Sequence, residues 1–299
     1  MILLAACSPA PAPEAAPEKP APVKPVKIDP QTPKWTATEG VNVPESAYLD
    51  SESGLLYVSE IVGMADVKDG DGRISRLTPD GKVIDAAWVT GLNAPKGLRR
   101  HNGILWTADI DEVVGIDIAT AKIKFRVKIK DAKFLNDLDC APDGTIYVSD
   151  MIASKIYAVK NNKAAVFVEG EDIEYPNGLL VEGDHLVVGG WGKPEPDFTT
   201  KVPGRLFKID LKTKKKTAIT PDPFANIDGL ESDGKGGYIV TDWTTGKVLQ
   251  VNGQGMVHQV AQFARGTADI SYIPATHLLI IPHMQENKIA EYDISDAIQ

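Results

Sequence analysis

The feature that most constrains this chain is a unit that recurs along it: a polar residue, a short apolar strand, a turn and a second apolar strand. Residues 134–151 show the unit most clearly, because a Pro-Asp-Gly turn separates their two strands. Six copies begin at polar positions, which we call the head residues: Glu45, Lys96, Asn136, Asn177, Asp228 and Asp269. Successive head residues are 51, 40, 41, 51 and 41 positions apart. Since a period of about 40 residues with several short strands is typical of a propeller blade, we predict an all-β fold, a six-bladed β-propeller.

Composition agrees with a folded domain and narrows the range of partners. Apolar residues make up 43% of the 299 residues, enough for a buried core, and they fall in short strand-like runs rich in Val, Ile and Tyr. The formal net charge of −9 disfavours nucleic acid or an anionic membrane surface as a partner. We expect a small-molecule ligand, no nucleic acid, and contact with a membrane only through a lipid anchor.

The first 33 residues predict an anchor and a tether ahead of the propeller. Residues 1–7 are apolar and end in Leu-Ala-Ala-Cys, which resembles the lipobox of a bacterial lipoprotein signal with Cys7 as the lipidated residue. Residues 8–33 contain nine prolines, a composition that favours an extended spacer over a core. We therefore expect a propeller of residues 34–299 held at the bacterial cell envelope, facing the periplasm or the exterior. An apolar N-terminus without a lipid, followed by an unanchored tail, is the alternative.

Ring closure and two loops carry further predictions. The last copy of the unit is one strand short, and residues 34–41 alternate like a strand, so we expect them to close the ring as its outer strand. Two of the spacings between head residues are 51 positions long, about ten more than the others. The additional residues fall at 62–71 in the first blade and 192–203 in the fourth, where the two loops would face each other across one channel mouth. Three second strands end in an aspartate that we expect to accept hydrogen bonds from loop amides: Asp109, Asp150 and Asp242.

The head residues converge on that mouth if each one begins the innermost strand of its blade. They include three carboxylates and two amides, and oxygen ligands from separate strands are what Ca²⁺ prefers. Six polar positions in register therefore favour a site for one divalent metal ion, with Ca²⁺ first and Zn²⁺, Mn²⁺ or Mg²⁺ as alternatives. A water-filled channel mouth, which tolerates polar residues without any ligand, is the other explanation.

Four head residues resemble those of the SMP-30/gluconolactonase/regucalcin-like family of six-bladed propellers. They are Glu45 in Pro-Glu-Ser, Asn136 in Asn-Asp-Leu, Asn177 in Asn-Gly-Leu and Asp228 in Asp-Gly-Leu. The resemblance implies one divalent metal ion held by Glu45, Asn177 and Asp228, with Asn136 completing the shell or placing the substrate. It also implies hydrolysis of a lactone or another activated ester, with Asp228 as catalytic base toward water or as nucleophile.

Two departures from the family pattern bear on this site. The family usually carries Pro-x-Trp after the glutamate of the first blade, where this chain has Ala-Tyr-Leu at residues 47–49. The family also does not generally place a cation at the head of the second blade, where this chain has Lys96. We expect Lys96 and Asp269 to bind substrate together with Asn136. A non-catalytic propeller lipoprotein that binds a protein or a glycan is the alternative function.

Overall fold

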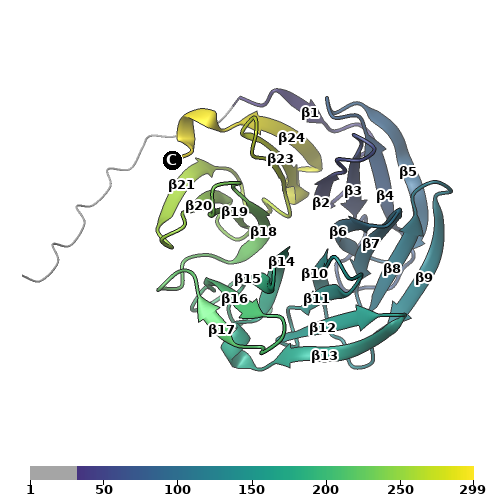
Figure 1. The fold of residues 1–299 in the computed structure, drawn as a ribbon. Helices are drawn as coiled ribbons and strands as arrows, with labels where there is room; N and C mark the ends of the chain where they lie inside the picture. The colour runs from purple at the N-terminus through teal and green to yellow at the C-terminus, as the bar shows by residue number, and fades with distance from the viewer. Residues whose placement is uncertain (1–31) are drawn as a thin grey trace, which may run out of the picture.

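The computed structural model describes residues 32–299, which form six four-stranded antiparallel sheets arranged as blades around a central channel (Figure 1). Each sheet runs from an innermost strand at the channel to an outermost strand at the rim. The predicted all-β fold and six-bladed propeller are thereby confirmed. Cys7 and nearly all of the predicted tether lie outside the described residues.

The blades, each written from the innermost strand outward, are β2 (Pro44–Leu49), β3 (Leu56–Glu60), β4 (Gly72–Leu77) and β5 (Val83–Leu92); β6 (Pro95–His101), β7 (Ile104–Asp109), β8 (Glu112–Asp117) and β9 (Lys122–Lys128); β10 (Leu135–Cys140), β11 (Ile146–Asp150), β12 (Lys155–Lys160) and β13 (Lys163–Glu169); β14 (Pro176–Glu182), β15 (His185–Gly190), β16 (Leu206–Asp210) and β17 (Lys216–Ala218); β18 (Ile227–Ser232), β19 (Tyr238–Asp242), β20 (Lys247–Val251) and β21 (Val257–Gln262); β22 (Ser271–Ile273), β23 (Leu278–His283), β24 (Lys288–Asp293) and β1 (Trp35–Ala37). Short 3₁₀ helices occur at η1 (Glu171–Ile173), η2 (Met284–Glu286) and η3 (Ser295–Ala297). No helix in residues 32–299 is long and apolar enough to cross a membrane.

The ring closes in the last blade, where the N-terminal strand β1 meets the C-terminal strand β24. The two strands are antiparallel, with Thr36 opposite Ala290 at the centre of three residue pairs. The ring of Trp35 covers Gly81 in the first blade so closely that an added Cβ would lie 2.2 Å from it. The prediction that residues 34–41 close the propeller is confirmed, because β1 lies within them and completes the sixth sheet.

The hydrophobic core is divided into segments that lie between neighbouring blades. One segment joins Ala108 and Val113 of the second blade to Leu138 and Val148 of the third. The other blade interfaces are built in the same way. Alternate side chains of a strand point to opposite faces of its sheet, so both faces of each blade are buried against a neighbour. Every blade depends on two others, which explains why an open ring would leave apolar surface exposed.

Acidic residues at the ends of second strands hold the start of the innermost strand in place. Asp109 accepts a hydrogen bond of 2.7 Å from the amide of Ala94, two residues ahead of the head residue of its blade. Asp150 accepts one of 3.0 Å from the amide of Phe134, which has the same position in the third blade. Asp242 also accepts amide hydrogen bonds, from the turn that follows it. The predicted role of these aspartates as acceptors for loop amides is confirmed, and in the second and third blades it fixes where the head residues stand.

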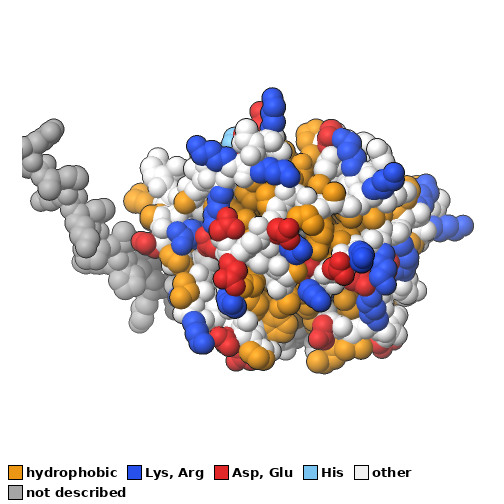
Figure 2. Space-filling model, turned by 90° about the horizontal axis from the view of Figure 1, so that it is seen from below, with side chains coloured by type: hydrophobic (Ala, Val, Ile, Leu, Met, Phe, Trp, Pro, Cys, Tyr) orange, Lys and Arg blue, Asp and Glu red, His pale blue; other side chains and the backbone are white. Residues whose placement is uncertain are grey.

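Figure 2 views the ring from its side. Lysine, arginine, aspartate and glutamate side chains are interspersed there with apolar ones, and no stretch of a single charge crosses this face. The concentration of like charges is found instead inside the channel, among the head residues and the positions that follow them.

Candidate functional site in the channel mouth

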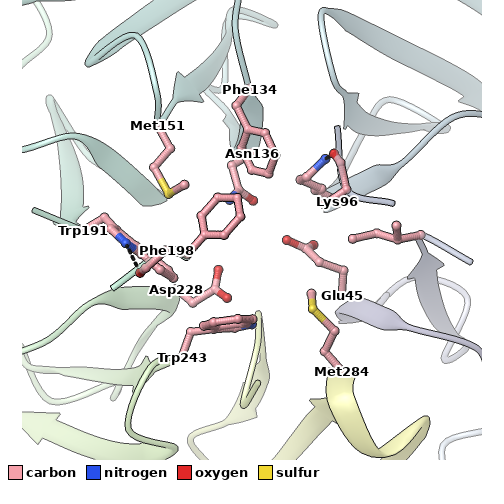
Figure 3. A pocket seen from close by; sticks show the side chains of 12 residues that line it. Glu45, Lys96, Phe134, Asn136, Met151, Trp191, Phe198, Asp228, Trp243 and Met284 are labelled. Carbon is pink, nitrogen blue, oxygen red and sulfur yellow. Dashed lines mark hydrogen bonds between the residues drawn. The ribbon is translucent and has the colours of Figure 1, made fainter. Parts of the chain in front are cut away.

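A cavity with about 390 Å³ of empty space, part of it open to solvent, lies at one mouth of the channel (Figure 3). Its lining residues are Glu45, Ile61, Ala65, Lys96, Phe134, Asn136, Met151, Trp191, Phe198, Asp228, Trp243 and Met284. Both long loops reach the cavity, the first through Ala65 and the second through Phe198. The predicted arrangement of residues 62–71 and 192–203 at the same mouth is therefore confirmed.

The head residues stand at breaks in the pairing between the first and second strands. The register shifts fall between Pro44 and Ser46, Pro95 and Leu98, Leu135 and Leu138, Pro176 and Leu179, and Ile227 and Leu230. Each shift is a β-bulge, which bends its strand and re-aims the side chains beside it. In five blades the bulge thus turns a polar side chain into the channel at the same height.

Glycine follows three of the head residues because the innermost strands nearly touch there. A Cβ added to Gly178 would lie 2.5 Å from the backbone oxygen of Asp228, and one added to Gly229 would lie 2.8 Å from the amide nitrogen of Ile270. Backbone atoms cannot move aside as the end of a flexible side chain can. The Asn-Gly and Asp-Gly pairs of the sequence are therefore required by the close approach of neighbouring blades.

Glu45 and Asp228 are the two carboxylates that line the cavity, and both are buried. Burial raises the pKa of Glu45 well above its usual value, and the negative charge of Asp228 raises it further. The pKa of Asp228 is also raised well above its usual value, first by burial and then by the charge of Asp269. Two buried carboxylates that repel each other need a counter-charge if both are to be ionised at neutral pH.

Two buried oxygens at this site have no hydrogen-bond partner within residues 32–299: Glu45 Oε2 and Asn177 Oδ1. Asn177 is oriented through its other end, because its Nδ2 donates a hydrogen bond of 3.0 Å to Asp228 Oδ1. A buried acceptor without a donor costs free energy. A cation bound between these side chains would satisfy both oxygens.

This set of donors fits a hard divalent cation. A positive charge would relieve the repulsion between the two carboxylates, and carboxylate and amide oxygens suit Ca²⁺, Mg²⁺ or Mn²⁺ better than Zn²⁺. No group of three or more His, Cys, Asp and Glu side chains in residues 32–299 is placed to hold a metal ion. The amide oxygens of Asn136 and Asn177 would therefore have to complete a shell begun by Glu45 and Asp228.

Lys96 is held at the cavity wall by backbone carbonyl groups. Its ammonium group donates hydrogen bonds to Ala94 at 2.9 Å and to Ala65 at 3.0 Å, and it lies 4.5 Å from the centre of the Phe134 ring. Burial lowers the pKa of Lys96 to about 8, although the nearby charge of Glu45 acts in the opposite direction. Lys96 therefore ties the first long loop to the wall and brings a positive charge to the cavity.

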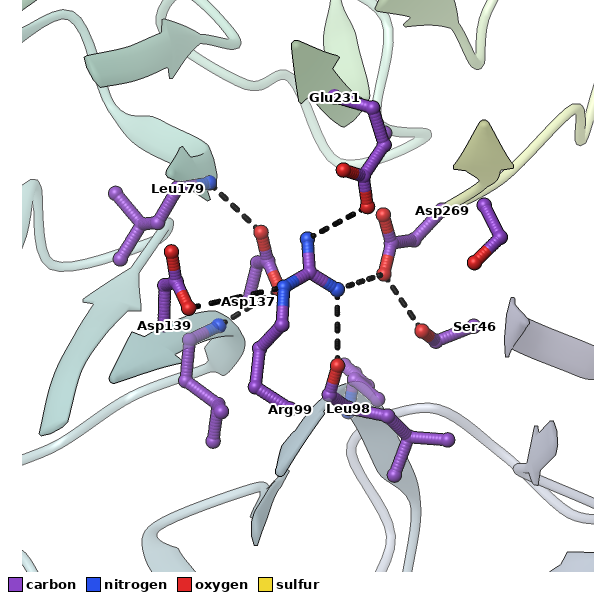
Figure 4. Close-up of polar contacts among 12 residues, drawn as sticks. Ser46, Leu98, Arg99, Asp137, Asp139, Leu179, Glu231 and Asp269 are labelled. Atoms are coloured by element: carbon purple, nitrogen blue, oxygen red, sulfur yellow. Dashed lines mark hydrogen bonds and ion pairs between the residues drawn. The ribbon is translucent and has the colours of Figure 1, made fainter. Parts of the chain in front are cut away.

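Asp269, the sixth head residue, is absent from the cavity lining and faces a different group of side chains (Figure 4). Its Oδ2 accepts a hydrogen bond of 2.6 Å from the Ser46 hydroxyl and lies 3.9 Å from Nη1 of Arg99. Nη2 of Arg99 lies 3.2 Å from Glu231, and Nε lies 3.8 Å from Asp139. Four head residues, Glu45, Lys96, Asn136 and Asp228, line the cavity, and the fully buried Asn177 contacts Asp228. Asp269 joins this buried ion-pair network instead.

We call this network the Arg99 layer, and it comprises Ser46, Arg99, Asp137, Asp139, Glu231 and Asp269. The repeat pattern did not predict it, although the sequence contains a signal for it. Arg99, Asp139 and Glu231 each stand three positions after a head residue. A regular strand returns to the same face after two residues, but the bulge adds one residue and shifts that position to the third.

The apolar lining of the cavity was also not predicted, although it occupies a column of its own. Five lining residues directly follow the last residue of a second strand: Ile61, Met151, Trp191, Trp243 and Met284. The rings of Trp191 and Trp243 are 5.9 Å apart, and those of Phe134 and Phe198 are 5.7 Å apart. The mouth therefore has a polar floor of head residues and walls of aromatic and sulfur-containing side chains.

Six blades around a channel, with an oxygen-lined floor and apolar walls at one mouth, define the class of this protein: a six-bladed propeller with a candidate ligand site in its channel. Residues 43–272 match the family described as SMP-30/Gluconolactonase/LRE-like region. The chain belongs to this family, which confirms the resemblance inferred from the head residues. A search of the curated proteins found no match.

Several solved structures share the fold. A catalytically inactive virginiamycin B lyase from Staphylococcus aureus with quinupristin is similar at 13% identity and a TM-score of 0.58, covering 86% of this chain and 97% of that one. A streptogramin B lyase is similar at 12% identity and a TM-score of 0.59, covering 84% and 93%. A chain of a nidogen/laminin complex is similar at 11% identity and a TM-score of 0.61, covering 85% and 89%. Identities this low establish a common fold alone.

Proposed function

We propose that this propeller is a divalent-metal-dependent hydrolase that opens lactones or cleaves other activated esters. The observation that carries the proposal is the pair of buried carboxylates in the cavity floor, Glu45 and Asp228, of which Glu45 Oε2, like Oδ1 of the neighbouring Asn177, has no hydrogen-bond partner in residues 32–299. Membership of the SMP-30/gluconolactonase family supports the same activity. Ca²⁺ is the ion we expect, because all four donors are oxygens.

Some residues of the floor would bind the cation or the substrate, and Asp228 would also transfer a proton. A bound divalent cation would act as a Lewis acid toward the ester carbonyl. Glu45, Asn177 and Asp228 would hold the cation, and Asn136 would complete the shell or donate a hydrogen bond to the substrate. Asn177 orients the Asp228 carboxylate, which faces the cavity (Figure 3). Asp228 would then take a proton from the attacking water, or attack the ester itself.

A panel of sugar, acyl and aromatic lactones, together with an activated phosphotriester, tests this proposal. We expect turnover with Ca²⁺, loss of turnover with a chelator, and a loss of about 10²- to 10⁴-fold in Asp228→Asn. Asp222→Asn, the same change at an exposed position, is the matched control and should keep full activity. Absence of turnover on the whole panel, together with no calorimetric signal for Ca²⁺, Mg²⁺ or Mn²⁺, would contradict the proposal and favour a protein- or glycan-binding propeller.

We also propose that Cys7 carries a lipid that holds the propeller at the bacterial cell envelope. Its support is the lipobox-like sequence at residues 1–7. Expression in a bacterial host with an alkyne-tagged fatty acid should label the wild-type chain and leave Cys7→Ser unlabelled. Equal labelling of the two chains, or labelling of neither, would contradict the anchor.

A further inference from the structure

The walls of the cavity carry information about the ligand that the metal-binding floor does not. Eight of the twelve lining side chains are apolar, and two of these are tryptophans, two phenylalanines and two methionines. The four polar ones are all head residues in the floor. From this division we propose that the ligand is a small, flat and mostly apolar cyclic ester, such as a lactone fused to an aromatic ring. That the ligand is an ester rests on the proposed function. That it is flat and mostly apolar rests on the side chains of the walls.

The walls offer few hydrogen bonds to a polar ligand. The indole Nε1 of Trp191 already donates a hydrogen bond of 3.2 Å to the carbonyl oxygen of Phe198. Two of the three ammonium hydrogens of Lys96 are directed at backbone carbonyl groups. A sugar lactone carries several hydroxyl groups, and each one that enters the cavity without a partner loses its hydrogen bonds to water. The cavity thus selects against polyhydroxylated lactones, whereas an aromatic ring can pack on the walls.

The second long loop is built to present an aromatic ring to the cavity. Phe198 has φ +62°, a left-handed conformation that is uncommon for a bulky residue and costs free energy. The surroundings hold it there, since Arg265 Nη2 donates a hydrogen bond of 2.6 Å to the carbonyl oxygen of Asp197. The same guanidinium lies 4.7 Å from the centre of the Trp243 ring, so one residue supports both the loop and the facing wall.

The arrangement also fixes the orientation of the ligand. The rings of Phe134, Phe198, Trp191 and Trp243 and the carboxylates of Glu45 and Asp228 surround the same cavity (Figure 3). A flat ring between these aromatic groups would direct its ester carbonyl toward the floor.

Two lactones with rings of the same size separate this inference from its alternative. We expect kcat/KM for dihydrocoumarin, whose lactone is fused to a benzene ring, to exceed that for glucono-δ-lactone by about 100-fold. Trp243→Ala and Phe198→Ala should each lower the value for dihydrocoumarin by roughly 3- to 10-fold through KM, and lower that for glucono-δ-lactone by a smaller factor. Val202→Ala, at an exposed position of the same loop, is the matched control and should change neither. Equal or better turnover of glucono-δ-lactone would overturn the inference and leave the hydrolase proposal standing.

Binding of the corresponding lactams, which resist hydrolysis, distinguishes failure of the ligand class from failure of the proposed function. With the full chain and Ca²⁺, dihydroquinolinone should quench tryptophan fluorescence and give a calorimetric signal, and Trp243→Phe should retain most of that affinity. Binding of this lactam without turnover of any lactone would support the ligand class and contradict the hydrolase. Preferential binding of gluconolactam would overturn the ligand class whatever the turnover experiments show.

Discussion

The channel contains two polar layers, and their difference shows how a ligand site can be told from a structural network. In the mouth, Glu45 Oε2 and Asn177 Oδ1 are buried without a hydrogen-bond partner in residues 32–299. In the Arg99 layer, Asp137 accepts hydrogen bonds from two backbone amides and Asp139 from two others. Both layers are acidic, buried and in register. Asp269 Oδ1 of the Arg99 layer also lacks a hydrogen-bond partner in residues 32–299. The mouth differs because its carboxylates, Glu45 and Asp228, line an accessible cavity, whereas the acids of the Arg99 layer are paired with Arg99 or with backbone amides.

The largest expected effect comes from removing the cation of the Arg99 layer. Arg99→Met leaves Asp139, Glu231 and Asp269 buried without their shared counter-charge, and we expect a loss of about 3–5 kcal/mol in the free energy of unfolding. Urea denaturation at pH 7 measures it. Arg126→Met removes an exposed ion pair with Glu112 and should cost less than about 1 kcal/mol. If the two variants lost the same small amount, the Arg99 layer would not be a structural network.

The pH dependence of stability tests the same layer with a smaller change. Burial raises the pKa of Glu231 from 4.5 to about 7, so the folded protein holds this proton when the unfolded chain has released it. The stability that Glu231 contributes is therefore complete below pH 4.5 and is lost as the pH rises to about 7. Glu231→Gln removes this dependence, and its stability relative to the wild type should increase by about 3 kcal/mol between pH 4 and pH 8. Parallel stability curves for the two proteins would contradict the assignment.

A substitution in the mouth should act in the opposite manner, on ion binding rather than on the fold. Glu45→Gln removes a charge that repels Asp228, so the ion-free protein should be at least as stable as the wild type at pH 7. The wild type should gain about 2.7 kcal/mol when free Ca²⁺ is 100 times its Kd, and the variant should lose most of this gain. Thermal unfolding with Ca²⁺ and with a chelator measures both quantities. A variant that is destabilised without Ca²⁺ would assign Glu45 to the structure and not to a site.

The smallest effect concerns the positive charge that departs from the family pattern. Lys96→Met removes a cation from the cavity wall, and we expect Ca²⁺ to bind about tenfold more tightly, equivalent to about 1.4 kcal/mol. Calorimetric titration of the full chain measures this change. Lys193→Met, which removes an exposed lysine outside the cavity, is the control and should leave the affinity unchanged. Weaker binding in Lys96→Met would mean that Lys96 helps to assemble the site, for example by holding the first long loop through Ala65.

The sequence predicted the fold and the floor of the site because both depend on periodicity. A repeat of about 40 residues was enough for the blades, the closing strand and the two long loops, and the head residues followed from their place in each repeat. The Arg99 layer was not predicted because it depends on a bulge, and one inserted residue exchanges the two faces of a strand. The periodicity also places Asp269 with the substrate-binding residues, whereas its side chain contacts Ser46 and Arg99.

The walls could not be predicted from alternation within strands, because they lie just beyond the strand ends. Trp191 and Trp243 read as ordinary apolar residues until the ends of β15 and β19 are known. Phe198 lies in a loop whose conformation depends on a contact with Arg265, 67 positions later in the sequence. Contacts of this kind follow from the closed ring and not from local pattern.

Closure by the pairing of β1 and β24 also gives the propeller a defined weak point under mechanical load. A force that pulls on the chain ahead of Lys34 reaches the ring through the three residue pairs of β1, while five other blades have strands that follow one another in sequence. We expect β1 to detach first and to lengthen the chain by no more than the segment before β2, after which a higher force is needed to separate the blades. In single-molecule pulling from the N-terminus, simultaneous rupture of several blades would contradict this order. If β1 does detach first, the pairing of β1 with β24 can break and reform under load while the other blades still support the channel and its cavity.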